Sequence, residues 1–208
     1  GYVVNIYGYC GQSALNEYAN FPFGGADMKS LEKLNRHMRN HRDPRAMLLR
    51  LVQAYGLTIG LAHVHRAGAS WEVDPSAHFN ASATKSTLPS TPALMVHYDI
   101  NPRNIALFKG GRPKINDFNI AEFVRYNPTT QQTCGFRSRM HAPWWRSPEE
   151  VRPSNDTHPV WLDEKVDIYA LGSTLSHLYT SYSPRGQMTQ AREQQVRQQV
   201  AAGEAPVL

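Results

Sequence analysis

The sequence predicts a mixed fold in which short strands are followed mainly by helices. Aromatic and β-branched residues cluster in 2–9 and again in 13–18, on either side of a turn that contains Gly11, which is typical of two short strands. Farther along, apolar residues recur at helical spacing in three segments. With 208 residues, 41% of them hydrophobic, the chain can bury one substantial core.

The first two helices are predicted between residues 27 and 68. Asp27 is a candidate N-cap for a helix whose apolar positions are Met28, Leu31, Leu34 and Met38. Pro44 stands at the start of a second, longer helix, from Arg45 to about His65, that ends near Gly68. This helix should be mostly buried along a stripe formed by Leu48, Leu51, Val52, Tyr55, Ile59 and Ala62.

Residues 69–92 differ from the helices around them, because Ser, Thr, Ala and Pro are frequent and large apolar groups are few. They are interpreted as a surface insertion. A third helix is marked from Val166 onward, and Gly172 within it would allow a neighbouring element to approach closely. The Gln-rich tail 187–202 is helix-prone but polar, so we expect it to lie on the surface or to fray.

Composition excludes several classes of function. Lys and Arg number 22 against 17 Asp and Glu, but they are scattered, with one loose cluster from Lys29 to Arg45, so a nucleic-acid groove is not indicated. Cys10 and Cys134 lack partners at metal-ligand spacing, which favours a reducing compartment. The sequence contains no run of about 18 apolar residues, so no membrane span is predicted. The chain begins at Gly1 with a strand-like stretch, and we expect that it starts within a longer protein.

The chemically informative stretch runs from 97 to 119. Gly110-Gly111 predicts a two-residue hairpin turn. Asn104 lies six residues before Gly110 and Asp117 six after Gly111, so a regular hairpin would place the two side chains opposite each other. Their oxygen atoms suit a hard cation such as magnesium, and Asp99, on the loop just before the hairpin, can reach the same mouth.

This stretch resembles the catalytic loop and the magnesium-binding loop of eukaryotic-type protein kinases. Order and rough spacing agree along essentially the whole chain. The segments that carry the resemblance are His97-Tyr98-Asp99, Asp117-Phe118-Asn119, Trp145-Arg146-Ser147-Pro148-Glu149, Asp167-Ile168-Tyr169-Ala170-Leu171-Gly172 and the hinge-like Glu17-Tyr18-Ala19.

The resemblance implies an α+β, protein-kinase-like fold, mostly the helical C-lobe with a remnant of the β-rich N-lobe. Residues 1–20 would form the remnant strands and the hinge, and 21–208 the helical lobe. Within that lobe, 69–92 would be the surface insertion and 117–149 the activation segment.

By the same resemblance, Asp99 accepts the proton of the substrate hydroxyl, with Asn104 beside it as a catalytic residue. Asn104 and Asp117 would bind Mg²⁺, and ATP is the implied nucleotide. Four residues are implied to support the site or anchor the segment that follows it: His97, Phe118, Glu149 and Asp167. The nucleotide itself would be contacted from Glu17, Ala19, Asp27 and Ala106, with Asn16 bordering the deep end of the adenine pocket.

The pattern also departs from the family. The Gly-rich loop, the strand Lys and the helix Glu of the family precede the hinge, and nothing precedes Gly1, so we expect the fragment to be inactive alone. The family's last helices are missing too. Three substitutions leave regulation and hydroxyl type open: Tyr98 for Arg, Asn101 for Lys and Ala142 for Thr. Asn119 replaces the family's Gly, and because Asn tolerates unusual backbone angles we expect it to absorb one in this loop.

Two functions therefore stand beside each other. The first is a kinase whose intact parent transfers the γ-phosphoryl group of ATP to Ser or Thr of a protein substrate, with Tyr not excluded. The second is a pseudokinase-type scaffold that binds partners. Neither implies nucleic acid or a membrane segment within this chain. Whether the parent has a membrane segment stays open, and a kinase domain is expected to face the cytosol.

Overall fold

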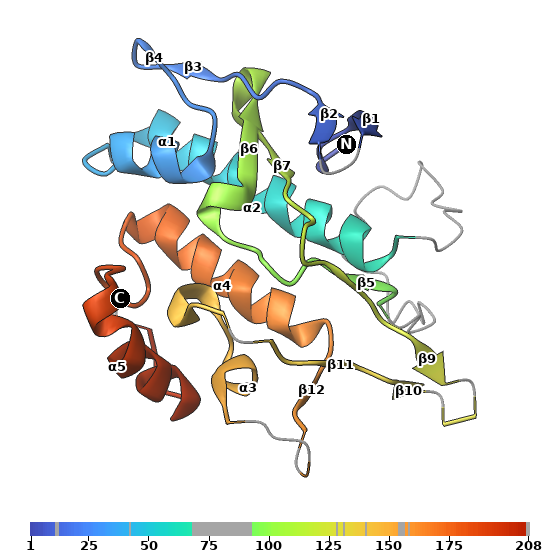
Figure 1. Cartoon of the computed structure of the whole chain (residues 1–208). Coiled ribbons are helices and arrows are strands. Elements are labelled where there is room, and N and C mark those ends of the chain that lie inside the picture. Colours follow the sequence, from blue (N-terminus) through green and yellow to red (C-terminus); the bar gives the residue numbers. More distant parts are fainter. Residues whose placement is uncertain are drawn as a thin grey trace, which may run out of the picture.

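The computed structural model describes residues 1–10, 13–41, 43–67, 93–127, 129–130, 132–139, 141–153, 157 and 159–206. The insertion expected at 69–92 lies outside them. Within the described residues the strands pair as two-stranded antiparallel sheets (Figure 1). Along the chain, α2 comes between β4 and β5, and α4 follows β12. The strands are β1 Ile6–Cys10, β2 Ser13–Asn16, β3 Pro22–Phe23, β4 Ala26–Asp27, β5 Met95–Val96, β6 Ile105–Phe108, β7 Arg112–Ile115, β8 Glu122–Phe123, β9 Tyr126–Asn127, β10 Gln132–Thr133, β11 Phe136–Arg137 and β12 Trp161–Leu162.

The α-helices carry most of the core. Helix α4 crosses the middle of the molecule, with α2 and the β6–β7 hairpin on one side and α3 and α5 on the other (Figure 1). Buried Leu57 and Leu61 of α2 meet Ile105, Ile115 and Leu171 in the main apolar cluster. The helices are α1 Leu31–His37, α2 Pro44–His65, α3 Pro148–Val151, α4 Lys165–Thr180 and α5 Gln190–Ala201.

The start of α2 agrees with the prediction, but its buried face does not. Asp43 caps the helix by accepting from the N–H groups of Arg45 (3.0 Å) and Ala46 (3.1 Å), with Pro44 in the first turn. The predicted apolar stripe instead faces outward, since Leu48 is 62% exposed and Tyr55 is 54% exposed. Apolar residues occur all round this helix, so periodicity alone did not identify the face that packs.

Glycines decide which face of α2 packs. A Cβ atom on Gly56 would lie 2.7 Å from the ring of Pro113, and one on Gly60 would lie 3.0 Å from the carbonyl oxygen of Tyr2. These glycines let β7 and the first residues approach the helix closely. The close approach expected at Gly172 is wrong, because a Cβ there would meet open space.

Arg50 fixes the first half of α2 to its neighbours. Its side chain is fully buried and donates to the carbonyl oxygens of Met38 (2.9 Å), His41 (2.9 Å) and Leu178 (3.0 Å). By length and mean hydropathy (1.3) α2 is also apolar enough to cross a membrane. Core helices share those properties, and one face of α2 packs against β7 and α4, while only 39% of its apolar stretch is buried.

Two further expectations are corrected. Asp27 lies in β4, and Ser30 is the N-cap of α1, accepting from the N–H of Lys33 (3.4 Å). The polar tail forms α5, which is anchored because Val196 and Val200 are fully buried against Trp144. Two valines one turn apart were enough to attach a helix that is otherwise polar.

Candidate active site

The β6–β7 hairpin carries the candidate site on its open end. Phe108 pairs with Arg112, and the turn contains three residues, Lys109–Gly111, rather than the predicted two. Gly110 and Gly111 both have positive φ, 79° and 74°, which explains why glycines occupy the turn. Asn104 is therefore opposite Asn116, whose N–H donates to its carbonyl oxygen (2.9 Å), and Asp117 lies one residue beyond the predicted position.

Asp99 is oriented by its own loop. The side-chain nitrogen of Asn104 donates to Asp99 Oδ2 (2.8 Å) and to the Asp99 carbonyl oxygen (2.9 Å). Asn101 donates to the same carbonyl (3.0 Å) and accepts from the N–H of Arg103 (3.0 Å). Asp99 and Asn104 are thus brought together, and the loop between them is closed by side-chain to backbone hydrogen bonds.

Asp167 of α4 holds this loop from below. Its carboxylate is almost fully buried and accepts from the N–H groups of His97 (2.7 Å) and Tyr98 (2.9 Å), and it lies 3.0 Å from Nε2 of His65. A carboxylate that accepts two backbone N–H bonds in the interior is a strong positional restraint. Helix α4 is therefore attached directly to the residues that precede Asp99.

His97 connects the loop of Asp99 to the loop of Asp117. Its Nε2 lies 2.9 Å from the carbonyl oxygen of Asn116, and its Nδ1 lies 3.2 Å from the N–H of Asp99. The ring is buried and meets Phe118 edge to face, at 4.6 Å between centroids. Burial lowers the pKa of His97, although the charge of Asp167 opposes the shift. The neutral ring with its proton on Nε2 satisfies both contacts.

Asp117 reaches the same cavity as Asp99. The cavity, about 430 Å³, is lined by both carboxylates, and by Asn119, His141 and Arg146 among others. The side-chain nitrogen of Asn104 is engaged by Asp99, and Asn104 is not among the residues that line this cavity, so its Oδ1 stays a predicted ligand. No cluster of three or more His, Cys, Asp or Glu occurs among the described residues. Carboxylate and amide oxygens in this small number fit Mg²⁺, which keeps waters and is also held by substrate phosphates.

The implied nucleotide residues are spread over a wider area. A cavity of about 810 Å³ on the other side of Asp117 is lined by Val4, Asn16 and Phe118 among others. Glu17, Ala19, Asp27 and Ala106 are not among its lining residues. Ala19 and Ala106 pack with Val4 behind it.

The Glu17 carboxylate is committed to internal contacts. It accepts from the N–H of Asn5 (2.7 Å) and from the buried ammonium group of Lys114. Burial would raise the pKa of Glu17, but these two donors hold it below its ordinary value. Asp27 lies in β4, and its Oδ1 is buried without a hydrogen-bond partner among the described residues.

Sequence reasoning missed Arg146 as a neighbour of Asp99. Its guanidinium lies 2.7 Å from Asp99 Oδ1 and 3.2 Å from Glu150 Oε1, and it donates to the carbonyl oxygen of Tyr98. Glu150 also accepts from the N–H of Ser147 (2.7 Å), and burial raises the pKa of Glu150 against the influence of Arg146. Glu150, rather than the expected Glu149, therefore makes the contacts that fix this segment. Nothing in the spacing of 145–150 indicated that Arg146 turns toward residue 99.

Tyr98 occupies its position as a packed anchor. It is 1% exposed, its ring meets Phe136 at 4.9 Å, and its hydroxyl accepts from the N–H of Arg139 (3.0 Å). The guanidinium of Arg146 lies 5.1 Å from the same ring. Burial raises the pKa of Tyr98, so the hydroxyl stays neutral. An aromatic ring thus joins the loop of Asp99 to residues 136–146.

The pattern of the protein kinase domain matches residues 92–205, more than half of the chain. The chain belongs to the protein kinase domain family. A probable serine/threonine-protein kinase PknB of Lactococcus lactis is 34% identical to it over 90 residues, 43% of this chain and 13% of the relative. The serine/threonine-protein kinase cds1 of Schizosaccharomyces pombe is 30% identical over 99 residues, 47% of this chain and 20% of the relative.

The other comparisons bear on fold and activity. A probable inactive receptor kinase, RLK902 of Arabidopsis thaliana, is 27% identical over 119 residues, 57% of this chain and 16% of the relative. This kinase-family chain therefore spans between 13% and 20% of the length of these three relatives. A chain in the crystal structure of the yeast RNA Pol II CTD kinase CTDK-1 complex superposes with a TM-score of 0.59 and 16% identity, covering 93% of this chain and 50% of that one. The predicted α+β, protein-kinase-like fold is confirmed. Family members in general use ATP and Mg²⁺.

Proposed function

We propose that the protein containing this chain transfers the γ-phosphoryl group of ATP to a Ser or Thr hydroxyl of a protein substrate. Asp99 accepts the proton of that hydroxyl, and Asn104 and Asp117 hold Mg²⁺ through their side-chain oxygens. Residues 1–20 then belong to the N-lobe and hinge, 21–208 to the helical lobe, and 117–149 to the activation segment. Glu17, Ala19 and Ala106 lie along the nucleotide side, with Asp27 at its edge.

The observation that carries the proposal is the shared cavity of Asp99 and Asp117. One carboxylate is restrained on a loop attached to α4, and the other belongs to a residue that lines the same cavity. Phosphoryl transfer needs little more from a protein than such positioning together with charge stabilisation. When bound, Mg²⁺ neutralises charge on the phosphates. The chain itself orients the hydroxyl, through Asp99, and places Asn104 and Asp117 toward the nucleotide.

A binding scaffold is the second candidate, and the position of Arg146 favours it. With Arg146 on Oδ1 and Asn104 on Oδ2, both oxygens of Asp99 already accept hydrogen bonds. A substrate hydroxyl must share Oδ1 with the guanidinium or displace it. A scaffold needs no free carboxylate here, and the contacts of Asp99 would then serve only stability.

Asp99→Asn in the full-length protein distinguishes the two. The amide keeps the shape of the side chain but cannot accept a proton, so we expect the rate of phosphate transfer from ATP to a protein substrate to fall about a hundredfold or more. Asp163→Asn is the matched control, because Asp163 lies outside the cavity beside Lys165. Unchanged phosphorylation by Asp99→Asn would contradict the enzyme proposal, and Mg²⁺-dependent phosphorylation by the unmodified protein would contradict the scaffold.

A further inference from the structure

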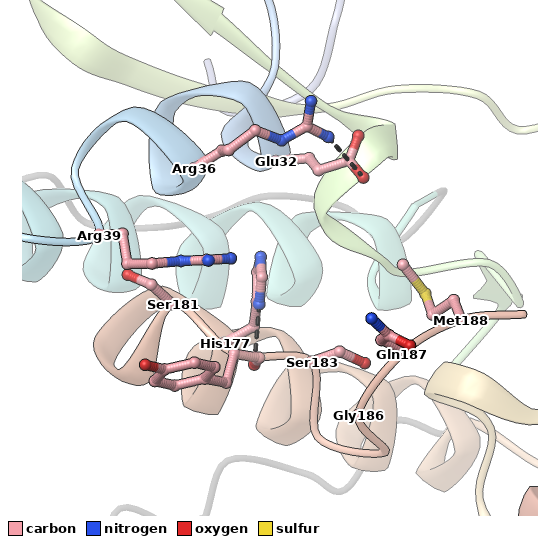
Figure 2. A pocket seen from close by; sticks show the side chains of 10 residues that line it. Glu32, Arg36, Arg39, His177, Ser181, Ser183, Gly186, Gln187 and Met188 are labelled. Carbon is pink, nitrogen blue, oxygen red and sulfur yellow. Dashed lines mark hydrogen bonds and ion pairs between the residues drawn. The ribbon is translucent and has the colours of Figure 1, made fainter.

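A third cavity lies beside the candidate active site. Figure 2 shows side chains from α1 above it and from the segment that follows α4 below it. Its volume is about 520 Å³. The residues that line it are Glu32, Arg36, Arg39, His177, Ser181, Tyr182, Ser183, Gly186, Gln187 and Met188.

The upper rim of this cavity is positively charged. Arg36 and Arg39 both lie on it, and the only carboxylate among its lining residues is Glu32. Glu32 lies 3.8 Å from Arg36 and 3.2 Å from Arg103, so two guanidinium groups share its charge. Arg39 lies 5.4 Å from the ring of Tyr182 and has no ion pair within the described part of the chain. Three arginines against one glutamate leave a net positive charge.

The lower wall offers uncharged hydrogen-bonding groups. The hydroxyl oxygens of Ser181 and Ser183 are buried, and neither has a hydrogen-bond partner among the described residues. His177 lies 2.9 Å, through Nδ1, from the carbonyl oxygen of Tyr182, and burial lowers the pKa of His177, which keeps the ring neutral. Orphan hydroxyls next to a basic rim are what an anionic group with several acceptor oxygens would satisfy.

The cavity adjoins the cavity of Asp99. Met188 lines both cavities, and Arg103, which lines the cavity of Asp99, is bonded to Glu32 of the third cavity. A peptide that presents a hydroxyl to Asp99 would therefore pass the Arg103–Glu32–Arg36 row as it leaves the site. A cationic side chain there would meet Arg36 and Arg39 with no unshared carboxylate to receive it.

We propose that this cavity binds an anionic side chain of the protein substrate, on the same polypeptide as the hydroxyl presented to Asp99. The inference rests on the proposed kinase function and adds a substrate class to it, namely sites with a nearby Asp, Glu or phosphoserine. Arg36 and Arg39 supply the charge, and Ser181 and Ser183 supply neutral donors. Arg103 holds Glu32 away from the incoming anion.

Peptide binding to the full-length protein, without ATP, tests the proposal. One fluorescent Ser-containing peptide is varied at single positions from two to six residues on either side of Ser, with Asp, phosphoserine, Ala or Lys at each. We expect Asp at one or more positions to tighten binding about fivefold over Ala, since partly exposed ion pairs contribute modestly, and Lys to weaken it. Phosphoserine should exceed Asp, because it carries more charge and three acceptor oxygens. High salt should reduce both preferences.

The double variant Arg36→Gln/Arg39→Gln should bind the Asp, phosphoserine and Ala peptides equally. Arg66→Gln, at the far end of α2 and likewise exposed, is the matched control and should keep the preference. Unchanged binding of the Ala peptide by every variant shows that the fold is intact. No preference for an anion at any position, or a preference that survives the double variant, would overturn the proposal. So would a single-stranded oligonucleotide that binds more tightly than any peptide through the same arginines.

The readout separates this inference from the proposed function. Arginine-dependent binding of acidic peptides together with full activity of Asp99→Asn would refute the assigned chemistry but leave the anion site. Loss of activity in Asp99→Asn, without any acidic preference, would refute the anion site alone.

Discussion

Two residues in the candidate active site region have a left-handed backbone, and they differ in burial and in hydrogen bonding. Tyr98, before Asp99, has φ 64°, and Asp117 has φ 67°. For residues with a Cβ this conformation costs about 1–2 kcal/mol. Tyr98 is buried and bonded through its N–H, its carbonyl and its hydroxyl. Asp117 is exposed, and among the described residues no hydrogen bond restrains its carboxylate.

The difference indicates two ways of placing a functional carboxylate. The loop of Asp99 is built before any ligand arrives, since Asp167, Asn104 and Arg146 all restrain it. The side chain of Asp117 is left free, which suits a group whose position is set by a cation and by phosphates. Preorganisation is therefore concentrated on the proposed base rather than on the metal ligand.

Removing the Asp167 carboxylate, which accepts from the N–H of Tyr98, should have the largest effect on stability. Asp167→Ala leaves the buried N–H groups of His97 and Tyr98 without an acceptor, and we expect the free energy of unfolding to fall by about 3 kcal/mol. Urea denaturation measures it. Asp163→Ala, just before α4, removes exposed contacts with the ammonium group (2.8 Å) and the N–H (3.0 Å) of Lys165 and should cost about 1 kcal/mol or less. Equal losses in both variants would show that the catalytic loop is not held as described.

Removing one hydrogen bond of Tyr98 should have an intermediate effect on stability. Tyr98→Phe keeps the ring against Phe136 and removes the hydroxyl that accepts from the N–H of Arg139. We expect a loss of about 1 kcal/mol in the free energy of unfolding, the usual net value of one hydrogen bond. Tyr182→Phe is the control, because that ring is largely exposed. If Tyr98→Phe were neutral, packing alone would anchor the loop to residues 136–139.

Local patterns in the sequence predicted much of this arrangement. The Gly110-Gly111 pair located the hairpin, Pro44 located the start of α2, and the fold class followed from the order of motifs. The hairpin register was off by one, because Lys109 joins the turn and Phe108 pairs with Arg112. Asn119 was expected to absorb an unusual backbone angle, whereas Asp117 has the positive φ in that loop.

Contacts between distant segments could not be predicted in the same way. Arg146 approaches Asp99 from 47 residues away, and only the path of the intervening chain decides that contact. The buried face of α2 was misassigned for a related reason: Gly56 and Gly60 face the core because Pro113 and Tyr2 approach there. The spacing of apolar residues shows which faces of a helix are apolar, but it does not show which of those faces packs against another element.

The smallest effect on stability is expected at Asp117. Asp117→Asn removes a charge from an exposed side chain, and Asn tolerates left-handed backbone well, so the free energy of unfolding should change by about 0.5 kcal/mol or less. Binding of Mg²⁺ together with ATP should weaken about tenfold or more, since one of two proposed oxygen ligands loses its charge. Thermal unfolding of the full-length protein at increasing Mg²⁺, with ATP held constant, measures both quantities. Glu122→Gln is the control, a nearby carboxylate paired with Arg139 outside the cavity. A large loss of stability in Asp117→Asn, or unchanged stabilisation by Mg²⁺, would mean that the two left-handed residues are held alike and that Asp117 is structural.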